Sequence, residues 1–303
     1  MKSVDIELLR KDFLGEGDAE IIEVLSEYTG GQPLHVAKHT GLCFVKERRS
    51  PEEIAKAWSE EVYGAKISRT SYTARNPIMK ARHVFVADFA DSIIGLHKKE
   101  VLDLGTGEGQ FLEIVRSDYG AIPYGVEPSA KNCQILEKQG IKNLAATIED
   151  FSIHKGGFKT KNFDVVTLMW TLCNVGNCVQ AIETAYGALK ENGHIVVAQG
   201  SRLLVPFKKP LHMYLNPMVK SDLHPWHFSA NSLRTLLEMV GFEIVATNRY
   251  FDQDNLLVIG VKKPNPVRKF LRDDYREILD FFKRWHEENA HYRHFDNSFS
   301  ERS

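Results

Sequence analysis

Hydrophobic positions from about Lys99 onward alternate between short β-branched runs and stretches with helical spacing. A short apolar run bounded by turn residues predicts a strand, whereas apolar residues three and four apart predict a helix. Their alternation favours crossover units and hence a parallel sheet. The predicted strands are Glu100–Leu104, Pro123–Glu127, Asn143–Ile148, Phe163–Trp170 and His194–Gln199. The predicted helices between them are Gly109–Ser117, Ala130–Lys138 and Cys178–Leu189.

The alternation is interrupted by a Pro- and His-containing stretch at residues 201–228. This stretch is too long for a simple connection, and long loops of this kind usually cover a functional site. The pattern resumes with a helix that Ser229 caps and Gly241 ends. Two strand-like runs, "FEIVAT" and "NLLVIGV", follow with only a short turn between them. So short a connection permits an antiparallel pair and forbids a parallel one.

The two ends of the chain lack this alternation. Residues 1–95 predict helices around one short extended segment, and "SPEE" at Ser50–Glu53 has the serine, proline and glutamate of a helix start. We expect a mostly helical cap or lid there, an α/β domain at 96–263 with 201–228 as its cover loop, and a docking helix with a tail at 264–303. Apolar residues of that last segment share one helical face: Phe270, Tyr275, Ile278, Leu279, Phe282 and Trp285.

The composition is that of a soluble globular enzyme, with 43% hydrophobic and 26% charged residues among 303. A formal net charge of -1 gives little attraction for a polyanion, which disfavours nucleic acid as a partner. The N-terminus has no signal-peptide pattern, and no apolar run approaches the roughly 20 residues that span a membrane. We expect a cytoplasmic protein with no membrane partner. Isolated cysteines without zinc spacing predict reduced thiols and no metal: Cys43, Cys133, Cys173 and Cys178.

A glycine-rich turn follows the first predicted strand in "VLDLGTGEGQFL". Glycines at 105, 107 and 109 let a ligand approach the backbone, because no Cβ stands in the way. Their spacing differs from the dinucleotide fingerprint, and Asp103 precedes the first glycine by two residues. A carboxylate at this place repels a diphosphate and attracts an ammonium group. The turn therefore favours an amino-acid ligand over a nicotinamide dinucleotide.

Glu127 lies 22 positions after Gly105, at the end of the second predicted strand in "YGVEPS". A carboxylate there can accept hydrogen bonds from both hydroxyls of an unmodified ribose. A nucleoside joined to an amino-acid ammonium describes S-adenosylmethionine.

With these motifs the sequence resembles the class I S-adenosylmethionine-dependent methyltransferases over roughly Lys99 to Lys263. "VLDLGTGEGQFL" and "YGVEPS" resemble their first two motifs, "FDVVTLMW" their fourth strand, and "ALKENGHIVVAQG" the entry to their fifth. The resemblance implies an α/β fold: a doubly wound, seven-stranded, mostly parallel sheet of order 3-2-1-4-5-7-6 with the last strand antiparallel.

The resemblance also implies roles for individual residues. Asp103 and the loop residues would hold the methionine end of the donor and Glu127 the ribose. Thr147, the Ile148 backbone or Glu149 would meet the adenine, where many relatives have an aspartate. Met169 and Trp170 either line the donor site or only pack at a buried strand end. The donor-site residues are thus Asp103, Gly105, Thr106, Gly107, Gly109, Glu127, Pro128, Thr147, Ile148, Glu149, Met169 and Trp170.

Candidate acceptor-site residues follow the fourth and fifth strands. Asn174 in "WTLCNV" cannot act as a base, but it can orient an acceptor or cap the next turn. His224 and His227 in "DLHPWHFS" resemble a segment of methyltransferases that act on sugars. Either histidine can deprotonate a hydroxyl or fasten a loop to the body. His224 is the first candidate for a base, with His227 and His212 behind it.

The N-terminal segment resembles the start of sugar C-methyltransferases without their zinc-binding cysteine pairs, so no zinc is carried over. In this fold the helix after "SPEE" usually closes over the donor. We expect a lid at "SRTSYTARNP" with Tyr72 and Arg75, and Arg82 just beyond it. An arginine there can pair with the methionine carboxylate or belong to a solvated basic face.

These patterns predict a methyltransferase that acts on a small polar acceptor, such as a sugar, nucleotide-sugar or surface-glycan hydroxyl. A natural-product or quinone-type methyltransferase is the alternative, and it predicts an apolar acceptor site. A non-catalytic module that binds S-adenosylmethionine is the alternative from another class. The sequence is compatible with a homodimer and does not fix the oligomeric state.

Overall fold

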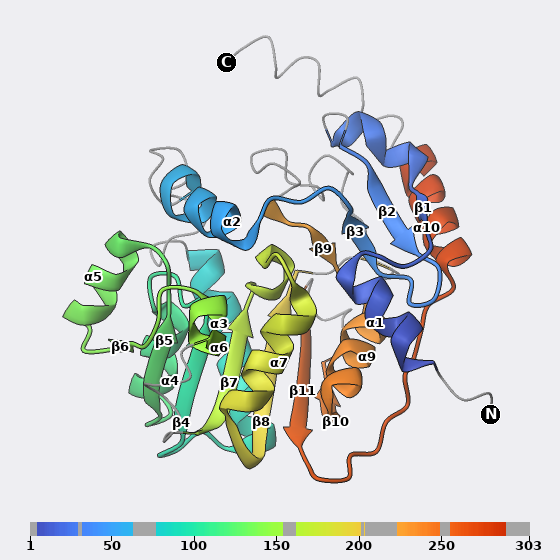
Figure 1. The fold of residues 1–303 in the computed structure, drawn as a ribbon. Coiled ribbons are helices and arrows are strands. Elements are labelled where there is room, and N and C mark those ends of the chain that lie inside the picture. Colours follow the sequence, from blue (N-terminus) through green and yellow to red (C-terminus); the bar gives the residue numbers. More distant parts are fainter. Residues whose placement is uncertain are drawn as a thin grey trace.

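The computed structural model describes residues 5–29, 32–62, 77–153, 162–200, 203, 223–248 and 255–288. Its centre is a seven-stranded sheet of order β10-β11-β8-β7-β4-β5-β6 (Figure 1). The predicted order 3-2-1-4-5-7-6 is confirmed, since β11 is antiparallel to both neighbours and the other ladders from β8 to β6 are parallel. The strands are β4 Glu100–Leu104, β5 Ile122–Val126, β6 Lys142–Asn143, β7 Phe163–Met169, β8 Leu189–Gln199, β10 Phe242–Thr247 and β11 Leu256–Lys262.

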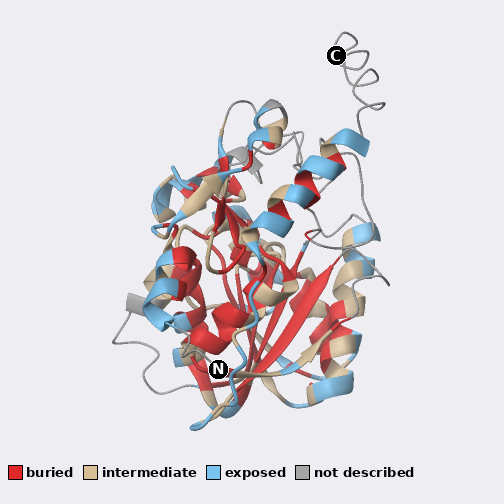
Figure 2. Cartoon of the chain, turned by 90° about the vertical axis from the view of Figure 1, so that its right-hand side faces the viewer, coloured by how far each residue is buried: buried red, intermediate tan, exposed pale blue. Residues whose placement is uncertain are grey.

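Helices cover both faces of the sheet because successive apolar residues of each strand point to opposite faces. Val101 belongs to the hydrophobic cluster under α3 and α4, whereas Leu102 belongs to the cluster under α7 and α9. Figure 2 shows the central strands as the most deeply buried part of the chain. The helices are α3 Pro77–Ile94, α4 Gln110–Ser117, α5 Ala130–Lys138, α6 Ile148–Ile153, α7 Cys178–Ala188 and α9 Ala230–Val240.

The predicted strand Asn143–Ile148 extends too far. The strand itself is Lys142–Asn143, Leu144 and Ala145 still share backbone hydrogen bonds with Gly125 and Glu127, and Ile148 begins helix α6. The Thr147 hydroxyl accepts a hydrogen bond from the Asp150 backbone N–H at 2.9 Å, and acidic residues occupy the first helical turn. Both features stabilise a helix start, so the local capping chemistry outweighs the apolar run that suggested a strand.

The described part of the N-terminal region contains three strands, not the single extended segment that its sequence predicts. They form a small antiparallel sheet of order β1-β2-β3-β9, whose last strand Trp226–His227 lies in the predicted cover loop. The helix predicted at "SPEE" begins at Pro51, and Ser50 and Glu53 form a reciprocal capping box. The elements are α1 Ile6–Leu14, β1 Ala19–Ile21, η1 Glu23–Tyr28, β2 Leu34–Ala37, β3 Cys43–Val45, α2 Pro51–Ala57 and η2 Trp58–Val62.

Alternating burial explains why this small sheet forms. Leu34 and Val36 point to a cluster shared with helix α10, Tyr275–Glu288. Phe44 and Trp226 point the other way, into the core shared with α7 and α9. Figure 1 shows α10 beside β1 and β2, although the helix lies near one end of the chain and these strands lie near the other.

Helix α10 buries Ile278, Phe281, Phe282 and Trp285. Phe270, expected on the same helical face, lies before the helix with a left-handed φ of 49° and packs on the core of the large sheet. No helix in the described ranges is long and apolar enough to cross a membrane.

Candidate active site

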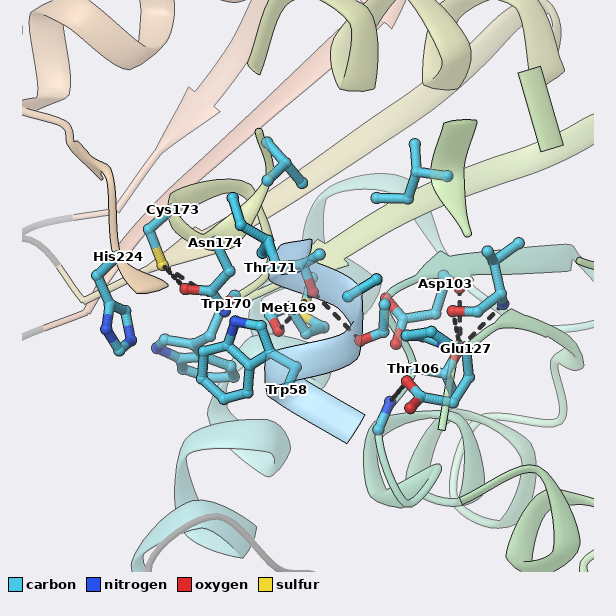
Figure 3. A pocket seen from close by; sticks show the side chains of 18 of the residues that line it. Trp58, Asp103, Thr106, Glu127, Met169, Trp170, Thr171, Cys173, Asn174 and His224 are labelled. Carbon is cyan, nitrogen blue, oxygen red and sulfur yellow. Dashed lines mark hydrogen bonds between the residues drawn. The ribbon is translucent and has the colours of Figure 1, made fainter. Parts of the chain in front are cut away.

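A cavity of about 520 Å³ lies at the carboxyl ends of β4, β5, β7 and β8. In an open parallel sheet this edge is where ligands bind. Residues of α2, α3 and the segment around β9 also line the cavity, so the N-terminal region closes it from outside the sheet. Figure 3 shows its two ends: Asp103, Thr106 and Glu127 lie at one, His224, Cys173 and Asn174 at the other, with Trp58 and Trp170 between them.

The glycine loop is built from three left-handed residues, with φ values of 83° at Gly105, 59° at Gly107 and 80° at Gly109. A Cβ on Gly105 would lie 2.4 Å from the Thr171 side chain, so only glycine fits there. Gly109 does not line the cavity, although the sequence places it in the donor site. A Cβ on it would lie 2.5 Å from Leu136, so Gly109 serves the close packing of α4 against α5.

Glu127 joins the glycine loop to the start of α5. One carboxylate oxygen accepts the Gly107 backbone N–H at 2.8 Å, and the other accepts the Ser129 N–H and the Asn132 side-chain amide, both at 3.0 Å. Burial raises the pKa of Glu127 to about 7, and these hydrogen bonds oppose the shift. A carboxylate offers about four acceptor positions, so one remains beyond the three bonds present. Its predicted contact with a ribose stays a prediction.

Asp103 is 1% exposed at the end of β4. Burial raises the pKa of Asp103 to about 7, and the nearby Glu127 carboxylate adds to this increase. The Thr167 hydroxyl donates a hydrogen bond to Asp103 at 2.7 Å and opposes the increase. Among the described residues no lysine or arginine pairs with Asp103. A buried acid without a cation is the partner that an amino-acid ammonium needs. The site therefore fits S-adenosylmethionine on its own geometry.

The predicted adenine end lies beside Glu127. Pro128, Thr147, Ile148 and Glu149 all line the cavity. The Thr147 hydroxyl already caps α6, which leaves the Ile148 backbone and the Glu149 side chain with more capacity for an adenine amino group. Burial raises the pKa of Glu149.

The opposite end of the cavity begins at Trp170, directly after β7. Its φ of 55° is left-handed, a conformation that costs a bulky residue about 1 to 3 kcal/mol and that clusters at functional sites. Asn174 donates from its side-chain amide to the Trp170 carbonyl at 2.9 Å, and the Cys173 thiol donates to the Asn174 amide oxygen at 3.1 Å. Asn174 thus closes the turn after β7 and lines the cavity at the same time.

His224 and His227 both line the cavity. Burial lowers the pKa of each to about 4, so both imidazoles are neutral near pH 7. The His224 ring meets the edge of the Trp58 ring at a centroid distance of 5.6 Å. His227 lies in β9 opposite Cys43.

The sequence analysis missed much of the cavity wall, including Trp58, His83 and Gln199. His83 lies in α3, shares a hydrogen bond of 2.9 Å with the Gln110 amide oxygen, and has a pKa lowered to about 4 by burial. Nothing in the local pattern of α3 marks this histidine, because its surroundings come from β7 and α4. Gln199 did carry a signal, since it is a polar residue at the carboxyl end of an apolar strand.

The predicted lid residues Tyr72 and Arg75 and the candidate base His212 lie outside the described residues. Arg82, just beyond the predicted lid, lines the cavity. The part of the chain that the structure describes contains no cluster of His, Cys, Asp or Glu that could hold a metal ion.

Comparison with known proteins matches residues 63–247 to a family described as "Methyltransferase domain". The ubiquinone biosynthesis O-methyltransferase of Haemophilus ducreyi is 29% identical over 116 residues, which cover 36% of this chain and 49% of that protein. The demethylmenaquinone methyltransferase of Tropheryma whipplei is 26% identical over 170 residues, covering 50% and 69%. The chain thus spans about half to two thirds of these relatives' lengths.

Among solved structures, the fold is similar to that of 1,6-didemethyltoxoflavin-N1-methyltransferase from Burkholderia thailandensis, with a TM-score of 0.53. The two are 14% identical, and the match covers 73% of this chain and 96% of the other. At this identity the likeness establishes the fold.

Binding of an ammonium-bearing ligand should weaken as the pH falls below about 7. Asp103 and Glu127 then hold protons, and a neutral carboxyl does not attract an ammonium group. Calorimetry with S-adenosylhomocysteine from pH 5.5 to 8 should show up to about tenfold weaker binding per pH unit for one coupled proton. Asp103→Asn should bind weakly at pH 8 and lose most of this dependence. A flat wild-type profile would contradict the assignment of Asp103.

Glu127→Ala should weaken donor binding by about 1 to 3 kcal/mol, because its hydrogen bonds to the ligand and to the Gly107 N–H are lost. Adenosine, which has the ribose but no ammonium, separates the two acids in the same assay. Its affinity should fall in Glu127→Ala and persist in Asp103→Asn. The exposed Glu137→Ala serves as the control. Unchanged adenosine binding in Glu127→Ala would remove this residue from the site.

Proposed function

The chain belongs to the methyltransferase-domain family, with S-adenosylmethionine as its methyl donor, and on that premise we propose that it methylates a hydroxyl oxygen of a planar aromatic molecule. The observation that carries this proposal is the aromatic wall of the cavity beyond the donor residues. That wall contains Trp58, Trp170, Trp226 and Phe228.

The donor end supplies charge and backbone contacts. Asp103 would hold the ammonium group, the bare backbone of Gly105 and Gly107 would admit the methionine chain, and Glu127 would accept from the ribose. Bound S-adenosylmethionine supplies a methyl group on a sulfonium, which an aligned oxygen displaces in line. The work left to the protein is to align the acceptor, exclude water and remove its proton.

The acceptor end favours an aromatic ring over a sugar. Indole and phenyl groups stack on a planar ring, whereas a sugar also needs several polar partners for its hydroxyl groups. Asn174, the polar residue expected to orient a sugar, uses its amide on the Trp170 carbonyl. The relatives from Haemophilus ducreyi and Tropheryma whipplei are named for quinone biosynthesis, which agrees with the quinone-type alternative. No relative named here supports a carbohydrate acceptor.

We assign proton removal to His224, with His227 behind it. Its imidazole is neutral at working pH and therefore has a lone pair to accept the hydroxyl proton as the oxygen attacks. The edge contact with Trp58 fixes the ring against the aromatic wall where a planar acceptor would stack. His83 is the competing base, since it lines the cavity and its hydrogen bond to Gln110 uses only Nδ1 of the ring.

A mass-shift screen with donor and protein tests the acceptor class. Catechols and hydroquinones should gain one methyl group, whereas nucleotide-sugars and free sugars should not, because the wall is apolar and aromatic. Methylation of a sugar would contradict the proposal. Donor binding without any turnover over a broad panel would favour the non-catalytic module.

His224→Ala should lower kcat by about a hundredfold or more and leave donor affinity unchanged, because a general base contributes about 10² to 10⁴ in rate. With saturating donor, the wild-type kcat should show no acid limb between pH 5.5 and 7, since the pKa of His224 is about 4. The exposed His97→Ala is the matched control. If His83→Ala abolishes turnover while His224→Ala does not, the base is His83.

A further inference from the structure

Among the described residues of the cavity wall, Gln199 and Trp170 each carry a buried hydrogen-bond donor without a partner. Gln199 is 2% exposed, and its side-chain nitrogen has no hydrogen-bond partner. The indole nitrogen of Trp170 is buried and likewise unpaired. Buried donors in folded proteins are nearly always satisfied, because an unmade hydrogen bond forfeits the solvation that burial removed. Two such groups in one cavity point to a ligand that completes them.

The two donors arise from one place in the sheet. Met169 pairs with Ala198 in the parallel ladder between β7 and β8, so Trp170 and Gln199 are the next residues on neighbouring strands. Adjacent strands lie about 4.8 Å apart, which lets one ligand group reach both side chains. Figure 3 shows the Trp170 indole extending toward His224 and away from Asp103 and Glu127. The Trp170 indole therefore faces the acceptor end, and Gln199 follows the neighbouring strand in the same cavity wall.

The chemistry of the pair specifies an oxygen that accepts hydrogen bonds. An indole N–H can only donate, and the unpaired atom of Gln199 is also its donor. The charge of the cavity lining then distinguishes between a charged and a neutral oxygen acceptor. The described lining includes the acids Asp103, Glu108, Glu127 and Glu149 against the single arginine Arg82. This balance disfavours a carboxylate and favours a neutral carbonyl.

We propose that Gln199 and Trp170 form a carbonyl-binding subsite, so that the methylated aromatic molecule carries a ketone or quinone-type carbonyl oxygen held between them. The inference rests on the proposed function and names its substrate class. The left-handed backbone of Trp170 agrees with this role, since strain at a bulky residue persists where the surrounding structure needs its side chain in one direction.

The test uses three catechols that carry a methyl, an acetyl or a carboxylate group at the same ring position. The wild type should show a KM for the acetyl compound about three- to tenfold below that for the methyl compound. Gln199→Met keeps the volume and removes the amide, and Trp170→Phe keeps a ring and removes the N–H. Each variant should bring the ratio of the two KM values toward one. Comparing the ratio between proteins cancels the electronic effect of the acetyl group on the hydroxyls.

Gln180→Met, on α7 outside the cavity wall, is the matched control and should keep the wild-type ratio. Donor affinity measured with S-adenosylhomocysteine should be unchanged in Gln199→Met, and circular dichroism should show that both test variants are folded. A ratio that is the same in wild type and variants overturns the subsite and leaves the proposed function standing. A preference for the carboxylate compound, or loss of donor affinity in Gln199→Met, overturns it as well. Methylation of none of the catechols refutes the proposed function and the inference with it.

Discussion

Two carboxyl groups are buried side by side at one edge of the sheet, and the rest of the site depends on how their charge is compensated. Asp103 lies near the end of β4 and Glu127 directly after the neighbouring parallel strand β5, and burial raises the pKa of both carboxyl groups. The Glu127 carboxylate adds to the shift at Asp103. Hydrogen bonds from Gly107, Ser129 and Asn132 offset part of that cost at Glu127. Asp103 accepts fewer hydrogen bonds, so more of the cost of burying its charge remains. With Asp103 assigned to the donor, the ammonium group of the ligand offsets that cost.

The acceptor half depends on contacts between segments far apart in the chain. The Trp226 indole donates to the Val175 carbonyl at 2.7 Å, and the Arg48 guanidinium lies over its ring at 4.3 Å. The Val45 backbone N–H donates to the Pro225 carbonyl at 2.9 Å. These contacts attach β9 to both β3 and the turn after β7. The small sheet is therefore the support that brings His224 and His227 over the carboxyl edge of the large one.

The donor end is built from consecutive strands and the acceptor end from segments far apart in the chain, and this difference explains what the sequence could predict. Asp103, the glycine loop and Glu127 lie at fixed offsets from apolar strands, so local spacing was enough to single them out. The sheet order came from the family resemblance that these motifs carry. Thr147 was misread as a strand residue because its capping role depends on Asp150 and on the helix that follows. Gly109 was assigned to the ligand, although its bare face meets Leu136. Nothing in the sequence indicated His83, because its partners Gln110 and Trp170 come from distant elements.

The difference between the two ends of the site also determines how much the fold says about the reaction. A donor site made from consecutive strand ends follows from the topology, and chains of low identity can share it without sharing a substrate. An acceptor site made from α2, α3, the turn after β7 and β9 changes whenever any one of these packs differently. Trp58 and Trp170 lie where the two halves meet, between Asp103 and Glu127 at one end and His224 at the other. On the proposed function, substrate choice depends on the covering elements and on the two strand ends beneath them. Gln199 is a deeply buried polar side chain at those ends that the donor, in this assignment, leaves unused.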